Sequence, residues 1–371
     1  MAMRVVDADG HIFEDTEAMG RRMPKMYRDW KSAHGLFARQ PWFPPLGFLH
    51  TPTGVFPEGA FGAGGWPGVD AWEAFIGATG IESAVLYPTN GLTYGHIANS
   101  DYAIAVARAY NDWLAETYLD RSPVFKGMGL VPLQEPGAAV EEARRCILEL
   151  GMTGIMLSGT GLKAHLGAKE YWPFYAEAER LGCPVAVHAG VHNGFGMDHM
   201  NVFAPAHAIG HPLAMMIALG GLVFNGVFDR FPGLRIAFLE SGAAWLLFCI
   251  ERFAGSHDNF VPLDWRGELL KLEPGQSVKD YMLGLIRNDR VFVGVEGDEY
   301  TLRPAIEAVG NSPFMFSTDF PHEVNTDKAR HNLAEIEASE ALSDADRKAI
   351  LHANADRFYA ARPSDLRAAA E

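Results

Sequence analysis

The chain has 371 residues, 48% of them hydrophobic, and a formal net charge of −15. This length allows one large core or two smaller ones. The acidic balance, with no basic run, argues against nucleic acid or an anionic membrane as the main partner. We see no apolar stretch near the roughly 18 residues of a membrane span, and we expect neither a span nor a signal peptide.

The three cysteines lie far apart in apolar contexts, at Cys146, Cys183 and Cys249. This spacing indicates neither a thiolate metal site nor a disulfide framework, so a cytoplasmic protein is the default expectation. Histidine usage is more informative, because several of the 14 histidines cluster between 188 and 211.

Short β-branched or apolar runs recur along the chain, with helical patterns between them. We expect strands at 5–11, 82–88, 124–131, 153–158, 184–189, 234–240, 291–296 and 313–319. We expect helices from Ser100, capped by Ser100 or Asp101, and at 136–151 and 170–182.

This alternation predicts parallel β-α-β units, and eight strands close a distorted (β/α)8 TIM barrel. A doubly wound sheet is the alternative, but no GxGxxG follows the first strand. We expect one domain over 1–371, with a C-terminal tail at 354–371. Residues 34–68, rich in Gly, Pro and aromatic residues, are expected as an inserted lid or binding loop, or else a surface excursion.

Polar side chains stand at the C-terminal ends of four expected strands, where TIM barrels carry their chemistry. Asp9 and His11 share one face of the first strand, because the side-chain period of a strand is 2. Burying such groups together without a cation would be costly, and imidazoles with carboxylates suit Zn, Mn or Fe. We therefore predict a metal centre formed by Asp9, His11, His188, Glu240 and Asp319.

Structural roles are the alternative for these residues. Glu240 could cap the helix that follows it through the helix dipole, and Asp319 could cap a turn. His322, three residues beyond Asp319, could orient that residue or line the pocket. His192 and His199 follow the fifth strand and are expected on the substrate side of the centre.

Other polar residues near these strand ends are expected to be less involved. Glu14 lies just beyond the first strand, and we expect it to be solvated, with a substrate-side position as the alternative. His207 and His211 are four residues apart and could share a helix face. Pro212, however, favours an extended backbone at His211, so we do not expect a paired site.

The chain resembles the amidohydrolase superfamily, in the branch around aminocarboxymuconate-semialdehyde decarboxylase and the resorcylate-type decarboxylases. The resemblance covers nearly the whole chain, through DGH in the first strand, VHAG in the fifth, FNGVFDRFPGLRIAFLESGAAWL around the sixth, STDFPH at the eighth and ILHANADRFYA near the end. It implies a distorted (β/α)8 barrel that holds a divalent metal on Asp9, His11, His188 and Asp319. The metal would activate water or polarise the substrate, and Asp319 would move a proton.

Two positions depart from the family pattern. Asp9 stands where many relatives have His or Glu, and Glu240 stands where the decarboxylases usually carry a His that handles protons or the leaving carboxylate. A glutamate there could act as a base, or as a ligand that brings a second metal.

We expect a metal-dependent hydrolase or lyase acting on a small carboxylated or aromatic compound, with Asp319 or Glu240 moving the proton. Three carboxylates and two histidines also suffice for two metals, so a dinuclear Fe or Mn/Fe oxygenase with an external electron donor is one alternative. A non-catalytic metal-binding partner subunit is another. Zn is expected for one metal and Fe or Mn for two, in a homo-oligomer or a hetero-oligomer with a homologous subunit.

Overall fold

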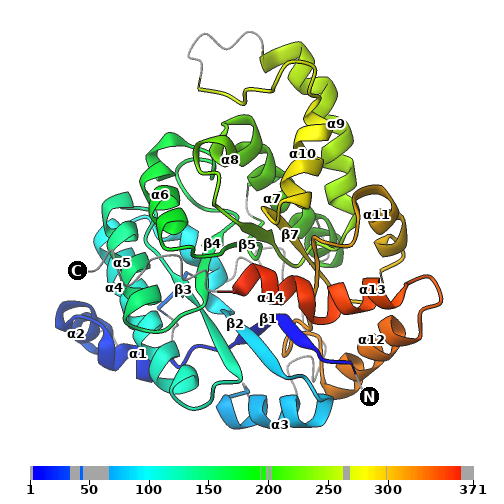
Figure 1. Cartoon of the computed structure of the whole chain (residues 1–371). Coiled ribbons are helices and arrows are strands. Elements are labelled where there is room, and N and C mark those ends of the chain that lie inside the picture. The colour runs from blue at the N-terminus through cyan, green and yellow to red at the C-terminus, as the bar shows by residue number, and fades with distance from the viewer. Residues whose placement is uncertain are drawn as a thin grey trace.

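The computed structural model describes residues 3–33, 42–44, 67–192, 194–197, 200, 203–261, 268–297 and 299–360. Within these residues, eight parallel strands follow one another in chain order around a barrel, and helices surround them (Figure 1). Each expected strand is present, and the predicted (β/α)8 architecture is confirmed. The strands are β1 (Val6–Ile12), β2 (Ser83–Pro88), β3 (Phe125–Leu130), β4 (Gly154–Ser158), β5 (Val185–His188), β6 (Ile236–Phe238), β7 (Val291–Val295) and β8 (Phe314–Phe316).

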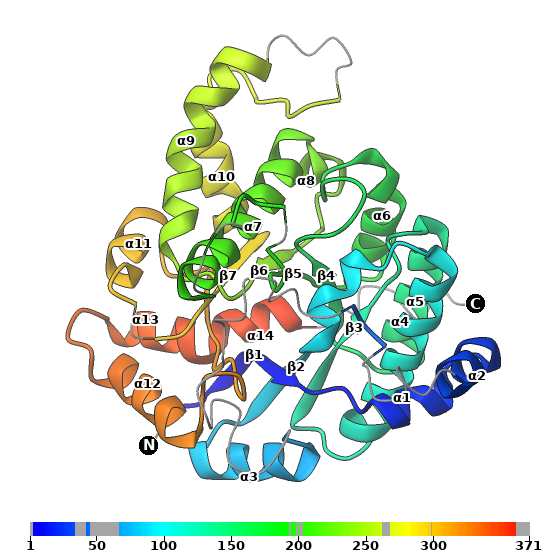
Figure 2. The ribbon, with the colours of Figure 1, turned by 180° about the vertical axis from the view of Figure 1, so that it is seen from behind.

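Helices follow the strands and form the outer layer of the barrel, as the view from behind also shows (Figure 2). The α-helices are α1 (Thr16–Arg22), α2 (Lys25–Ala33), α3 (Val69–Thr79), α4 (Ser100–Leu114), α5 (Pro136–Leu148), α6 (Trp172–Arg180), α7 (Phe203–Phe224), α8 (Val227–Arg230), α9 (Ala244–Phe260), α10 (Val278–Arg287), α11 (Leu302–Val309), α12 (Thr326–Ala338), α13 (Asp344–Lys348) and α14 (Asn354–Tyr359). Short 3-10 segments are η2 (Asn90–His96) and η4 (Lys169–Tyr171), and π-helical segments are η3 (Ala115–Leu119) and η6 (Ala349–Ala353).

Side-chain hydrogen bonds join the first strand to the segment after the last. Thr318 donates to the carboxylate of Asp7 from its backbone nitrogen at 2.9 Å and from its hydroxyl at 2.6 Å. The backbone nitrogen of Asp319 donates to the carbonyl of Asp9 at 2.9 Å. Because β8 has only three residues, these bonds fix how the two ends of the barrel meet.

The loop and cap predictions have different outcomes. Most of the predicted 34–68 insertion lies outside the described residues, as does 361–371. The predicted cap of α4 is wrong by one residue, because the side chain of Asn99 accepts from the backbone nitrogen of Tyr102 at 2.8 Å.

The stretch 354–371, expected as a tail, begins with a packed helix. Helix α14 lies beside β1, although the two elements come from opposite ends of the chain (Figures 1 and 2). The hydroxyl of Tyr359 donates to the buried carbonyl of Ala8 at 2.6 Å, and its oxygen lies 2.7 Å from the hydroxyl of Tyr87. Long-range bonds of this kind anchor a helix too short to be stable alone.

Helix α7 corrects the expectation that no long apolar stretch exists. Its segment Ala204–Phe224 is long and apolar enough, by length and composition, to cross a membrane. In this fold it packs against β5, α8 and α9, and 44% of it is buried. A helix packed on a barrel can meet the same length and composition criterion, so this feature alone does not indicate a membrane protein.

We predict that Tyr359→Phe lowers the free energy of unfolding by about 1–3 kcal/mol, because two buried polar partners lose their hydrogen bond. Urea denaturation followed by circular dichroism measures the change. Tyr300→Phe is the matched control, since Tyr300 is 95% exposed and its loss should stay within about 0.5 kcal/mol. Equal losses in the two variants would contradict the anchoring role of Tyr359.

Candidate metal centre

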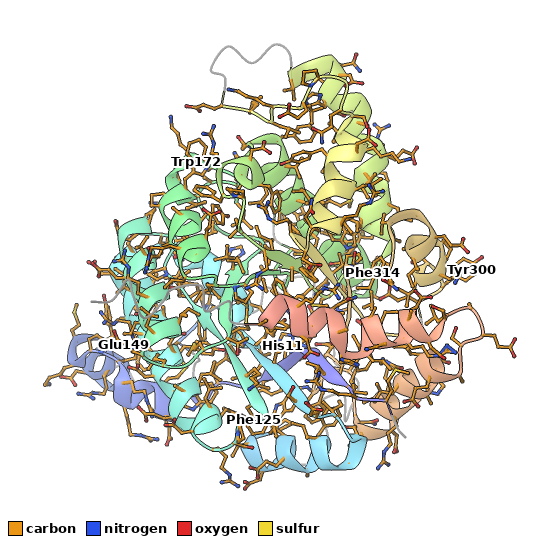
Figure 3. The ribbon with its side chains drawn as sticks, viewed as in Figure 1. His11, Phe125, Glu149, Trp172, Tyr300 and Phe314 are labelled. Atoms are coloured by element: carbon orange, nitrogen blue, oxygen red, sulfur yellow. The ribbon has the colours of Figure 1, made fainter. Side chains whose placement is uncertain are left out.

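The structure brings together all five residues of the predicted centre. Asp9 and His11 lie in β1, and His188 is the last residue of β5. Glu240 and Asp319 follow the ends of β6 and β8. Figure 3 shows His11 near the middle of the barrel. Asp9, His11 and His188 have no exposed surface.

Three carboxylates face one imidazole nitrogen. His11 Nε2 lies 3.5 Å from Asp9 Oδ1, 3.4 Å from Glu240 Oε1 and 3.5 Å from Asp319 Oδ1. On the other side of Asp9, Oδ2 lies 3.3 Å from His188 Nε2. Donors from four different strand ends therefore surround one small volume, as a metal site requires.

Backbone carbonyls fix the orientation of both histidines. His11 Nδ1 lies 3.0 Å from the carbonyl oxygen of Pro88, and His188 Nδ1 lies 2.7 Å from that of Ala189. Since a carbonyl only accepts, each Nδ1 must carry the hydrogen, which leaves the lone pair of a neutral ring on Nε2. This is the arrangement that metal-binding histidines generally use.

The facing atoms have no hydrogen bonds of their own. Both carboxylate oxygens of Asp9 and the Nε2 atoms of His11 and His188 are buried without a hydrogen-bond partner. Buried polar atoms are nearly always hydrogen-bonded, so these four atoms call for a ligand. Imidazole nitrogen and carboxylate oxygen together fit Mn²⁺, Fe²⁺ or Zn²⁺.

The pKa values of three side chains at the centre are raised, because three carboxylates lie close together there. Burial disfavours a charged His188, yet Glu240 and Asp9 outweigh it and raise the pKa of His188 to about 9. Burial, with a contribution from Glu240, raises the pKa of Asp319 well above its usual value. Burial also opposes charge on His322, but Asp319 and Glu240 outweigh it and raise that pKa too. Without a metal, these side chains therefore bind protons, and a divalent cation would displace those protons when it binds.

Glu240 and Asp319 share an unusual backbone conformation. Their φ angles are 53° and 57°, in the left-handed region that side chains other than glycine rarely adopt. Each such residue costs about 1–3 kcal/mol and is typical of functional sites. The turn after Glu240 is held by Glu299, whose carboxylate accepts from the backbone nitrogen of Ala243 at 2.7 Å.

His322 lies directly against Asp319. Its Nδ1 is 2.8 Å from Asp319 Oδ1, and its Nε2 is 3.1 Å from the hydroxyl of Thr89. His322 therefore links the carboxyl group of Asp319 to Thr89, which lies between β2 and η2.

His211 was not expected at the centre, and the extended backbone predicted there is wrong. Helix α7 continues through Pro212 and carries His211 to Glu240, where Nε2 lies 3.2 Å from Oε2. Proline removes the bond to the carbonyl of Ala208, but Ala208 is exposed, so water can satisfy that carbonyl. The spacing of four between His207 and His211 was the signal that could have found this residue.

The other residues predicted near the centre are Glu14, His192 and His199. Glu14 is not solvated: it is 8% exposed, and its carboxylate accepts from Asn90 and the backbone nitrogen of Gly91, which anchors η2. His192 is buried, with its ring centroid 4.6 Å from that of His211. His199 lies outside the described residues.

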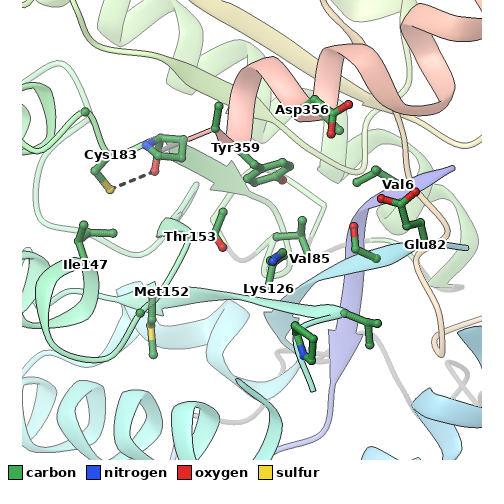
Figure 4. A pocket seen from close by; sticks show the side chains of 18 of the residues that line it. Val6, Glu82, Val85, Lys126, Ile147, Met152, Thr153, Cys183, Asp356 and Tyr359 are labelled. Carbon is green, nitrogen blue, oxygen red and sulfur yellow. Dashed lines mark hydrogen bonds between the residues drawn. The ribbon is translucent and has the colours of Figure 1, made fainter. Parts of the chain in front are cut away.

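A cavity of about 660 Å³ lies elsewhere in the barrel and contains none of these residues. Lys126, Cys183 and Tyr359 are among the residues that line it (Figure 4). Its strand residues come from the N-terminal ends of the strands, opposite the metal centre. The volume of this cavity therefore does not mark the functional site. The buried atoms of Asp9, His11 and His188 without hydrogen-bond partners mark it instead.

Comparison with known proteins identifies the family. Residues 79–361 match the model of the amidohydrolase family, and the chain belongs to that family. A gamma-resorcylate decarboxylase from Rhodococcus jostii (strain RHA1) is 31% identical over 296 residues, which cover 75% of this chain and 83% of that protein. A 2-amino-3-carboxymuconate-6-semialdehyde decarboxylase from Dictyostelium discoideum is 25% identical over 279 residues, covering 73% and 71%.

A solved structure agrees in fold. The 5-carboxyvanillate decarboxylase of Novosphingobium aromaticivorans, complexed with manganese and 4-hydroxy-3-methoxy-5-nitrobenzoic acid, matches with a TM-score of 0.67 at 20% identity over 96% of each chain. The resemblance to the decarboxylase branch is thereby confirmed, and this chain is an enzyme of the amidohydrolase superfamily.

We predict that His188→Ala lowers the affinity for Mn²⁺ by about 100-fold or more, beyond the roughly 10–100-fold typical of residues that only orient a ligand. Isothermal titration of the metal-free protein measures this loss. His331→Ala, at an exposed position of α12, is the control and should bind Mn²⁺ normally. Unchanged affinity in His188→Ala would remove His188 from the ligand set.

Proposed function

We propose that this chain is a divalent-metal-dependent decarboxylase of hydroxylated aromatic carboxylic acids. Its relatives at 25–31% identity are named as decarboxylases, and a structural neighbour holds manganese with an aromatic acid. Mn²⁺ is therefore the metal we propose first, ahead of Zn²⁺. Asp9, His11, His188 and Asp319 would hold it.

The observation that carries the proposal is the contact between the carboxyl group of Asp319 and Nδ1 of His322, which lie 2.8 Å apart at the edge of the centre. Burial raises the pKa of this carboxyl group well above its usual value. Asp319 and Glu240 also raise the pKa of His322 against the effect of burial, so the Asp319–His322 pair retains a proton between its two side chains. A proton donor with its own supply of protons is what decarboxylation of an aromatic ring needs.

The reaction breaks the bond between the ring carbon and the carboxylate carbon. The electron pair stays on the ring carbon, CO₂ leaves, and Asp319 donates its proton to that carbon. His322 then returns a proton to Asp319. When bound, a divalent cation supplies positive charge that holds the oxygens of the substrate and offsets the charge on the ring.

Glu240 has a different role from the histidine that the family pattern places there. Burial alone would raise its pKa, but His188, followed by His11, His211 and His322, holds that pKa well below its usual value. Glu240 therefore remains an anion and is a poor proton donor. In this chain the Asp319–His322 pair takes over proton transfer.

The test is turnover of gamma-resorcylate by protein reconstituted with Mn²⁺, followed by CO₂ release and by loss of the aromatic acid. Asp319→Asn should lower the rate about 10²–10⁴-fold, because the amide has no proton of suitable acidity to give. A panel of other hydroxybenzoic acids extends the search to the preferred ring pattern.

His331→Ala again serves as the control and should keep full activity. Hydrolysis of an ester or amide without CO₂ release would overturn the proposal in favour of a hydrolase. Oxygen consumption that depends on an electron donor would overturn it in favour of an oxygenase.

A further inference from the structure

The cavity at the N-terminal ends of the strands has the size of a small-molecule site. Its volume is about 660 Å³, and pockets that bind small organic molecules generally measure about 300–1,000 Å³. Ser83 of β2, Lys126 of β3, and Thr153 and Pro184 just before β4 and β5 line it. Helix α14 forms another wall (Figure 4). The cavity therefore lies where the barrel opens opposite the metal centre.

Two buried tyrosines separate this cavity from the metal centre. Tyr359 lines the cavity, and its hydroxyl oxygen lies 2.7 Å from that of Tyr87. The ring of Tyr87 in turn lies against His188, with 5.6 Å between the ring centroids. A molecule in the cavity would therefore occupy a different site from a molecule at the metal centre.

Lys126 places a positive charge in the cavity. It pairs with Val85 in the parallel ladder between β2 and β3, so the two side chains lie on the same face of the sheet. Val85 shares that face with Tyr87, which contacts His188 inside the barrel. The other five residues of β3 are buried, whereas Lys126 is exposed and lines the cavity. A ligand in the cavity can therefore reach the ammonium group.

The ammonium group of Lys126 has no ion pair or hydrogen bond with any described residue. Arg4, the other basic residue in the lining, is already engaged: its Nε lies 2.7 Å from Glu82, and its Nη1 contacts Asp356. An ammonium group offers three donors and attracts a carboxylate strongly. Lys126 is therefore the basic group in the described lining that remains available to an anion.

The wall beside Lys126 is largely apolar. Val85, Ile147, Leu148 and Met152 contribute side chains to it. Leu148 is 47% exposed, which leaves a large apolar side chain open to a ligand. Ligand sites generally combine such apolar walls with a few polar groups that fix orientation. An apolar body would fit against this wall while an acidic group meets Lys126.

We propose that this cavity binds a small carboxylic acid with an apolar body. The carboxylate pairs with Lys126, and the body packs against Val85, Leu148 and Met152. The proposal goes beyond the proposed function and does not depend on it, because no residue of the metal centre takes part.

Isothermal titration of the Mn²⁺-loaded protein with octanoate and with 1-naphthoate tests the proposal. We expect at least one of these acids to bind in the cavity, one molecule per chain. Lys126→Met should weaken that binding about 10-fold or more, because a charge-assisted hydrogen bond is lost. Lys126→Arg should retain most of the affinity, because it keeps the charge. Lys328→Met, at an exposed position of α12, is the matched control and should bind normally.

The neutral octan-1-ol and the variant His188→Ala identify the group and the site. We expect octan-1-ol to bind about 10-fold more weakly than octanoate, since it lacks the charge. Binding in the cavity should persist in His188→Ala, because this substitution changes the metal centre alone. Tighter binding of octanoate would support an aliphatic body, and tighter binding of 1-naphthoate an aromatic one.

Unchanged affinity in Lys126→Met would overturn the proposal, and so would equal binding of octanoate and octan-1-ol. Binding that is lost in His188→Ala but kept in Lys126→Met would place the acid at the metal centre and would also overturn it. The same holds if neither acid binds at millimolar concentration. Circular dichroism checks that each variant folds, and Lys126→Gln decides if Lys126→Met does not. Since the readout is binding, failure of CO₂ release would refute only the proposed function.

Discussion

Three carboxylates that converge on one buried imidazole are the constraint on which this structure depends. Asp9, Glu240 and Asp319 lie within 3.4–3.5 Å of His11 Nε2, at the ends of three different strands. Like charges so close together in a poorly hydrated interior repel strongly unless positive charge lies among them. The barrel therefore places repelling carboxylates together and leaves space between them in which a bound cation would offset their charge.

The centre depends on the seam at which the first and last strands of the barrel meet. Asp7 and Thr318, which join the first and last strands, are 311 positions apart in the chain. The same seam places Asp9 next to Asp319 through a backbone hydrogen bond. Local structure contributes little to such an arrangement, so the centre forms only when the long-range contacts of the whole domain are in place.

The sequence predicts the barrel and the five converging residues because strand period and the position of strand ends are enough for both. It fails where a side chain depends on contacts distant in the chain. Glu14 is buried because residues 90 and 91 supply its donors. His211 reaches Glu240 because α7 continues through Pro212, where the residue one turn earlier, Ala208, is exposed. The residues next to Glu14 do not reveal its burial, and Pro212 predicts the opposite of the helical backbone that forms at His211.

The left-handed backbone at Glu240 and Asp319 lowers the stability of the fold at positions that the metal centre needs. Glycine at either position would relieve backbone strain and remove a buried charge in one step, and would thereby favour the metal-free fold while it dismantled the centre. Selection for a more stable protein would therefore erase these residues, as expected where activity and stability conflict. Their presence at two strand ends of this chain is itself a sign that the centre is maintained for use.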